Sequence, residues 1–215
     1  TLFPYTTLFR SANHQYLAKM AKAGHIKYLI TTNFDLFIEK AFEKEKISYH
    51  VYRTEEDFGS FVFKENTETV NLFKLHGCIS IPNTIIATVE QEGKGLSLAK
   101  QKVLEELLKQ YHFIFWGYSG ADLKIDLDYL RMVTQKDVAK GFVWNFLLSK
   151  NYQEPVNPYV EKLKYIYKEK AQIVHGKLPE IYDQFIDTSD QIYCKKYTLE
   201  QEIAWKEQNN KRSEE

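Results

Sequence analysis

Three polar motifs, each directly after a predicted strand, contain the residue types of this chain that could do chemistry. They are Thr31-Thr32-Asn33-Phe34-Asp35, Lys74-Leu75-His76-Gly77 and Gly117-Tyr118-Ser119-Gly120-Ala121-Asp122. Asparagine both donates and accepts hydrogen bonds, histidine exchanges protons near neutral pH, and glycine lets the backbone approach a ligand closely. These residue types suit binding of ribose hydroxyls or phosphates and transfer of a proton.

Each motif also has a structural interpretation when it is taken alone. Asn33 or Asp35 could cap the helix that follows, His76 could be a hydrogen-bonded structural residue, and Asp122 could cap a further helix. The glycine-flanked turn is by itself no more specific than other short glycine-rich loops. Five further histidines show no spacing typical of metal ligands, so we assign them no role: His14, His25, His50, His112 and His175.

The hydrophobic pattern predicts the elements that must position these motifs. Helical spacing covers residues 15–23, 36–42, 96–111, 122–133, 158–170 and 178–185. Strand patterns cover 27–32, 48–53, 61–63, 70–75, 112–116, 141–148 and 171–174, with a β-excursion over 79–89. We expect the apolar runs at 112–116 and 141–148 to be buried on both faces of a sheet.

Strands that alternate with helices of this length predict a Rossmann-like α/β fold, a parallel sheet with helices on both faces. The carboxyl ends of parallel strands meet at one edge of the sheet, where such folds bind their ligands. Because all three motifs follow strands, we expect them to deliver their polar groups to one crevice.

Composition excludes several classes of protein. The 215 residues include 29 basic and 29 acidic side chains, so net charge gives no attraction to nucleic acid or to anionic membranes. The two cysteines, with no CxxC pair, provide neither a disulfide framework nor a cysteine-paired zinc site, which fits a cytoplasmic protein. No apolar run approaches the roughly 20 residues that span a bilayer.

Residues 1–11 resemble the in-frame translation of a short-read sequencing adapter, and we exclude them from the argument about the fold. The alternative is an ordinary aromatic-rich strand. We expect a single domain over 12–187 and a polar, helical tail or the start of another region over 188–215. With the adapter removed, the reading frame is expected to lack its original N-terminus.

Taken together and in this order, the three motifs resemble the signatures of SIR2-like domains, which are relatives of the sirtuins. The resemblance covers roughly residues 28–185. It implies NAD as the ligand. By this resemblance, Asn33 orients the attacking water at the nicotinamide ribose, Asp35 helps to hold the nicotinamide end, and His76 acts as the base on the ribose hydroxyls.

The resemblance also implies the residues that contact the cofactor. Ser119 and the Gly117 and Gly120 backbone are expected at the adenosine ribose or phosphates, with Asn145 as a weaker candidate there. The implied catalytic pair is Asn33 and His76, and no metal is expected. The full implied cofactor-binding set is Thr32, Asn33, Asp35, Gly77, Gly117, Tyr118, Ser119, Gly120, Asp122 and Asn145.

Two departures from the family pattern shape the functional hypothesis. Sirtuin deacylases carry two CxxC pairs for zinc, which this sequence does not have, whereas zinc-free bacterial SIR2-like domains commonly hydrolyse NAD in antiviral defence. The family's glycine-rich phosphate loop and first strand are also missing, and we expect them upstream of Ala12, so the fragment itself could be unable to bind NAD.

The hypothesis is therefore an NAD hydrolase. The alternatives are an NAD-dependent deacylase and a non-catalytic module that binds NAD or ADP-ribose. Other defence subunits, a fused sensor domain or a second copy of the chain are the expected partners.

Overall fold

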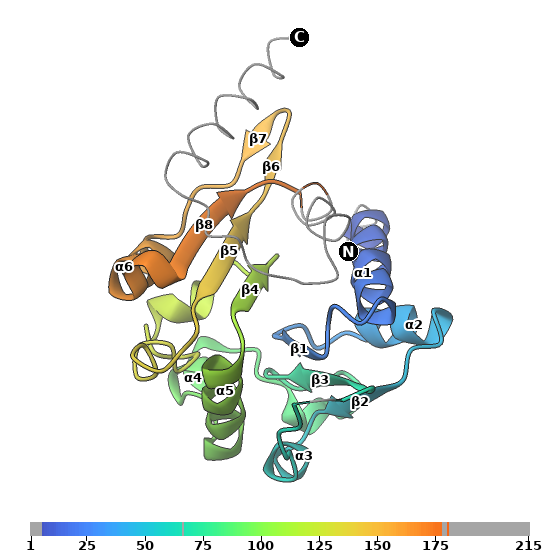
Figure 1. Cartoon of the computed structure of the whole chain (residues 1–215). Helices are drawn as coiled ribbons and strands as arrows, with labels where there is room; N and C mark the ends of the chain where they lie inside the picture. The colour runs from blue at the N-terminus through green and yellow to red at the C-terminus, as the bar shows by residue number, and fades with distance from the viewer. Residues whose placement is uncertain (1–5, 66, 178–179, 181–215) are drawn as a thin grey trace. The chain divides into compact units, whose positions relative to one another are not determined.

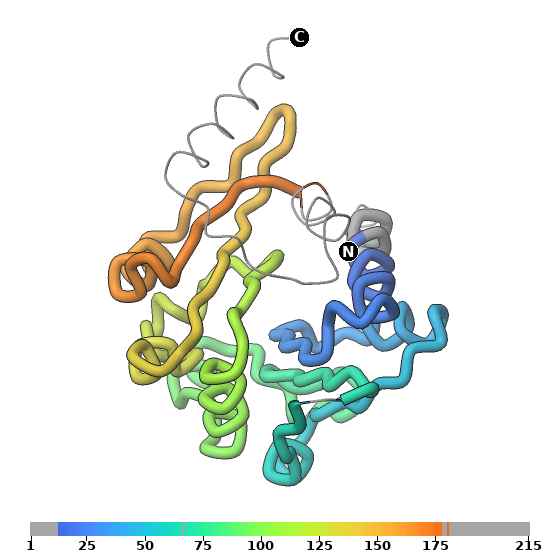
Figure 2. Tube along the Cα trace, in the orientation of Figure 1, coloured from blue at the N-terminus to red at the C-terminus, as the bar shows by residue number. Residues whose placement is uncertain are grey.

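The computed structural model describes residues 6–65, 67–177 and 180 (Figure 1), and Figure 2 follows the same chain along its Cα trace. The chain forms two compact units. Unit 1 contains the residues up to Lys109 together with Asp122–Gln135, and unit 2 contains Gln110–Ala121 and the residues from Lys136 onward. Among the helices of the described residues, none combines the length and apolar character that crossing a bilayer requires.

Unit 1 is built on a parallel sheet of three strands, β1 (Tyr28–Thr31), β2 (Tyr49–Tyr52) and β3 (Val70–Lys74) (Figure 1). Their order is β1-β3-β2, so β3 is the central strand. Thr31 lies beside Lys74 in the register. The carboxyl ends of β1 and β3 therefore lie next to each other, and the first two polar motifs leave the sheet at the same edge.

One face of this sheet packs against helices α1 (Thr6–Lys22) and α2 (Phe37–Lys44). After α1, Gly24 adopts the left-handed conformation (φ +82°) typical of a residue that follows a helix end. Small and aliphatic side chains make most of this core, as helical and strand periodicity predict. Its buried members are Ala18, Ala21, Ile38, Ala41, Phe42, Val70 and Leu72.

The other face of the sheet carries a cluster of aromatic rings. The Tyr52 and Phe73 rings stack with centroids 4.4 Å apart, and Phe58 of helix α3 (Glu55–Gly59) packs against Phe73. The predicted strand over 61–63 is wrong, because this segment has no regular structure. Its rings pack on the cluster instead, with Phe61 edge-on to Phe73 at 5.1 Å.

The prediction of a β-excursion over 79–89 is also wrong. The segment contains a single isolated bridge, between Cys78 and Ile81, and the short 3₁₀ helix η1 (Pro82–Thr84), which starts at its proline. A capping box between Thr88 and Gln91 then begins helix α4 (Val89–Gly93). Helix α5 (Leu98–Gln110) follows and confirms the helical period predicted over 96–111.

The helix predicted over 122–133 is replaced by η2 (Ala121–Lys124) and a series of turns. Aspartate side chains bind the backbone N–H groups that a helix would use. Asp126 accepts from the Asp128 backbone at 2.8 Å, and Asp128 accepts from the Thr134 backbone at 2.9 Å. Hydrophobic spacing alone does not predict this competition of the side chains for backbone N–H groups.

Unit 2 contains a second parallel sheet in the order β4-β5-β8, from β4 (Phe113–Trp116), β5 (Phe142–Phe146) and β8 (Ala171–His175). Helix α6 (Pro158–Tyr167) packs on β8 and runs into the 3₁₀ helix η3 (Lys168–Lys170). A two-stranded antiparallel ribbon, β6 (Leu148–Ser149) and β7 (Tyr152–Gln153), completes the described part of the unit.

Trp144 is the centre of the packing in unit 2. Its fully buried ring stacks on Phe115 with centroids 4.0 Å apart, and its Nε1 donates to the Tyr118 carbonyl at 3.1 Å. The prediction that 112–116 is buried on both faces is wrong, because Ile114 is 46% exposed. The prediction that the whole run over 141–148 is buried is also wrong, because the side chain of Leu147 is 45% exposed.

The predicted fold class is confirmed, since both main sheets are parallel and helices flank them (Figure 1). In the described residues, six strands divide between two three-stranded parallel sheets, and β6 and β7 form the separate antiparallel ribbon. The predicted helix over 178–185 lies outside the described residues apart from residue 180, and the predicted tail over 188–215 lies wholly outside them.

Candidate functional site

The first motif forms the connection between β1 and α2. Asn33 is exposed, and its backbone N–H donates to the Thr31 hydroxyl at 3.0 Å. Thr32 is half-buried. The Asp35 carboxylate accepts from the Phe37 backbone N–H at 2.9 Å, which satisfies a donor at the start of α2. The N-cap position itself is Leu36, which makes no side-chain capping bond, so Asp35 binds the helix start from one residue further upstream. Its contact with nicotinamide stays a prediction.

The second motif ends β3, and its backbone is tied to the first motif. The Ile79 N–H donates to the Phe34 carbonyl at 2.8 Å, and the Ile86 N–H donates to the His76 carbonyl at 3.0 Å. His76 and Gly77 are both buried. The structure thus brings the loops that carry the two predicted catalytic residues, Asn33 and His76, to neighbouring strand ends.

Gly77 makes the sharp turn after His76. Its φ is +83°, and a Cβ at this position would overlap the backbone carbonyl of Thr84. We expect Gly77→Ala to destabilise unit 1 by more than about 2 kcal/mol, since the strained conformation alone costs roughly 1–2 kcal/mol. Hydrogen exchange of the β3 amides measures this change.

Gly24→Ala is the matched control for that substitution. Gly24 has nearly the same φ, +82°, and nothing lies within 4 Å of the place that a Cβ would take, so this variant isolates the conformational cost from the overlap. Equal losses for the two variants would show that the contact with Thr84 is unimportant.

Lys74, two residues before His76, carries a buried charge. Its fully buried Nζ lies 2.8 Å from Glu39 Oε1 and also donates to the Asp35 carbonyl. Cys78 Sγ lies 3.7 Å from the same ammonium. Burial raises the pKa of the Cys78 thiol, but hydrogen bonds from Ser80 and the charge of Lys74 outweigh that effect and lower it. This network fixes the segment that leads into the histidine.

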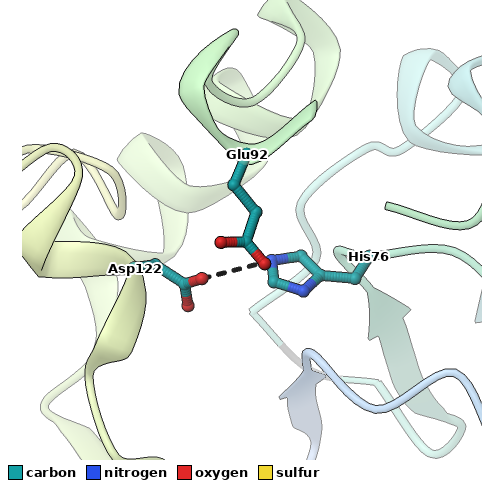
Figure 3. Close-up of side chains that lie close together, drawn as sticks. All are labelled: His76, Glu92 and Asp122. Carbon is teal, nitrogen blue, oxygen red and sulfur yellow. Dashed lines mark ion pairs between the residues drawn. The ribbon is translucent and has the colours of Figure 1, made fainter. Parts of the chain in front are cut away.

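His76 is surrounded by polar groups from two other segments of unit 1. Its Nε2 lies 2.9 Å from the Tyr129 hydroxyl and 4.0 Å from Asp122 Oδ1. Glu92, in α4, approaches the same side of the ring (Figure 3). His76, Asp122 and Tyr129 are 7%, 5% and 2% exposed. The structure therefore brings Asp122 of the third motif to the histidine of the second.

The surroundings of His76 set its protonation. Burial lowers the pKa of its imidazole, and Lys100 lowers it further, while Asp122 and Glu92 act in the opposite direction. The net shift is downward from the ordinary value, so the ring is neutral near pH 7 and can accept a proton.

His76, Glu92 and Asp122 are also residue types that bind divalent cations, and one ligand atom from each lies within 4.8 Å of the others. A cation at Nε2 would have to displace the hydrogen bond between this nitrogen and Tyr129.

The rest of the third motif lies in unit 2. Gly117 and Gly120 have positive φ, +61° and +72°, as expected of a glycine turn. The carbonyls of Ser119 and Gly120 accept from the Asn157 side chain at 2.8 and 3.1 Å. Tyr118 is half-buried, and its ring stacks against the core of the unit. The turn is thus held from α6 by the capping residue of that helix.

Asn145 lies near the end of β5 with its amide group engaged. Its Nδ2 donates to the carbonyls of Phe146 and Gly176, both at 3.2 Å. These bonds tie the ends of β5 and β8 together. The contact of Asn145 with adenosine stays a prediction, as does that of the glycine turn.

Comparison with known protein families matches a SIR2-like domain to residues 27–137, more than half of the chain. The chain belongs to the SIR2-like domain family. No curated protein matches it closely enough to be counted as a relative. The matched region of this SIR2-like domain contains all three motifs and every group that surrounds His76.

Sequence reasoning missed two residues of the candidate site around His76, namely Glu92 and Tyr129. Glu92 falls just beyond the wrongly predicted β-excursion, and Tyr129 falls in the wrongly predicted helix. Neither residue directly follows a strand, and the three motifs were found by searching for polar residues at strand ends. The sequence contains no local signal for either residue.

Proposed function

We propose that this SIR2-like domain binds NAD and cleaves the bond between nicotinamide and ribose. The observation that carries the proposal is His76, a buried and neutral imidazole at a strand end, held beside two carboxylates and tied through its loop to the Asn33 loop. A neutral histidine in such a place can accept a proton from a ribose hydroxyl or from water.

The proposed reaction is a hydrolysis. The C–N bond to nicotinamide breaks with its electron pair going to the ring nitrogen, and the sugar develops oxocarbenium character. Water adds at the anomeric carbon, its oxygen positioned by the Asn33 side chain, and the released proton passes by way of His76 to solvent. The products are nicotinamide, ADP-ribose and one proton.

The residues suit the charge that this reaction develops. Nicotinamide leaves as a neutral molecule and needs no general acid, so one histidine and one asparagine suffice where glycosidases use paired carboxylates. Asp122 and Glu92 place negative charge beside His76, which favours the proton that it receives and a positively charged sugar nearby.

The first experiment measures NAD loss and nicotinamide release by the purified protein, with long-read sequencing of its gene to define the full reading frame. We expect stoichiometric ADP-ribose without any acylated substrate. Nicotinamide release that depends on an acetyl-lysine peptide would instead identify a deacylase. Tight NAD binding without turnover would identify a binding module.

We further propose that this activity depletes the NAD of the bacterial cytoplasm during antiviral defence. The resemblance of the three motifs to zinc-free bacterial SIR2-like domains supports this role. Cells that express the protein are expected to lose NAD only after infection. An unchanged NAD level in infected cells would contradict the role in defence but would not contradict the hydrolase activity.

Removal of metal is expected to leave turnover unchanged. The Nε2 of His76 is already engaged by Tyr129, and the proposed chemistry uses no Lewis acid. Dialysis against EDTA, followed by an NAD assay with and without added magnesium, tests this. A loss of activity that magnesium restores would place a cation at His76, Glu92 and Asp122.

A further inference from the structure

The hydroxyl of Tyr129 is the group nearest to the ring nitrogen of His76 among the contacts described for unit 1. The two atoms are 2.9 Å apart, while Asp122 Oδ1 lies 4.0 Å from the same nitrogen. The first distance is that of a hydrogen bond, and the second is too long for one. The tyrosine, and not the aspartate of the sequence motif, therefore holds the imidazole directly.

Both partners of this hydrogen bond are buried, so breaking the bond is costly and the imidazole is held in one orientation. A buried phenol requires a hydrogen-bond partner, because leaving it without one has a substantial desolvation cost. Burial raises the pKa of Tyr129, and Asp122 and Glu92 raise it further, so the phenol keeps its own proton. For His76 to act as a base, its Nε2–H must donate to the tyrosine oxygen, which leaves the lone pair of Nδ1 to accept a proton. The two rings meet edge to face, at 83°.

We propose that Tyr129 is a positioning residue for His76 and fixes the orientation of the imidazole that the proton transfer requires. This inference rests on the proposed function. Rotation of the ring by half a turn would replace Nε2 with a carbon atom and lose the bond, so the hydroxyl selects one of the two orientations. Asp122 and Glu92 then act on the charge of a ring whose direction the tyrosine has set.

Tyr129→Phe tests the inference, because it removes one oxygen atom and retains the ring that packs beside His76. We expect kcat for NAD loss to fall about 10-fold to 100-fold, the scale of a misoriented catalytic group, with KM changed less than about twofold. The same substitution in a His76→Ala background is expected to have no further effect on the residual rate. Equal losses in both backgrounds would show a merely structural role and overturn the inference.

Tyr52→Phe is the matched control. Tyr52 is also a buried tyrosine of unit 1, and its hydroxyl bonds to Asn71 Oδ1 at 3.1 Å. We expect this variant to keep the wild-type kcat. A loss equal to that of Tyr129→Phe would attribute the effect to the removal of any buried hydroxyl and would also overturn the inference.

A measurement without NAD separates this inference from the proposed function. In the nitrogen-15 NMR spectrum, Tyr129→Phe is expected to shift the His76 Nε2 resonance, and His76→Ala assigns that resonance by removing it. An unchanged resonance would refute the hydrogen bond. A protein that shows the shift but no NAD loss in any form would contradict the proposed function alone, whereas a shift with an unchanged kcat would refute positioning.

Discussion

His76→Ala lowers the rate of NAD cleavage more than about 100-fold, the scale expected when a positioned acid–base group is lost. Alanine removes the ring nitrogen that accepts the proton. Tyr129, Asp122 and Glu92 remain, but none of them takes the place of the imidazole as the base. The assay follows nicotinamide release by the purified protein. A rate similar to that of the wild type would contradict the assignment of His76 as the base.

Asn33→Ala is expected to cause a loss of similar size for a different reason. Asn33 is exposed and its backbone is held by Thr31, so truncation of the side chain removes the group that orients water while disturbing little structure. His112→Ala is the matched control, since His112 is exposed and lies in unit 2. Similar losses in the control and in the two site variants would indicate a general effect on folding.

Glu39→Ala destabilises unit 1 by about 3–5 kcal/mol, the usual result of leaving a buried charge without its partner. The Lys74 ammonium is fully buried and lies 2.8 Å from Glu39 Oε1, and the Arg53 guanidinium lies 3.9 Å from the same oxygen. Removal of the carboxylate leaves the Lys74 ammonium and the Arg53 guanidinium without this negatively charged partner.

Hydrogen exchange of the β3 amides is the measurement to use. The tryptophans among the described residues, Trp116 and Trp144, lie in unit 2, so their fluorescence would report on the wrong part of the chain. Glu45→Ala is the control. Glu45 pairs with Lys22 at an exposed site, where such a pair contributes at most about 1 kcal/mol. A loss below that value for Glu39→Ala would show that the buried ammonium has other sufficient partners.

The double substitution Lys74→Met with Glu39→Leu distinguishes a charge effect from a packing effect. Replacing both members of a buried pair with apolar side chains is often neutral, so most of the lost stability is expected to return. A double variant as unstable as Glu39→Ala would show that the shape of the side chains, and not the unpaired charge, is responsible.

The strands of unit 1 and the polar residues that follow them are predictable from the order of the residues. Hydrophobic patterning predicts β1, β2 and β3, and parallel strands end at one edge, so Asn33 and His76 are expected on neighbouring loops, as the structure confirms. The family could also be predicted from the sequence, because each of its motifs is contiguous in the chain and can be recognised without knowledge of the packing.

The surroundings of the histidine, by contrast, follow from the packing of distant segments. Tyr129 lies 53 residues from His76 in the chain, and no periodicity relates two residues at that separation. Asp126 and Asp128 also turned a predicted helix into a series of turns by binding backbone donors. Contacts of this kind depend on the path of the whole chain, and local patterns of hydrophobicity do not contain that path.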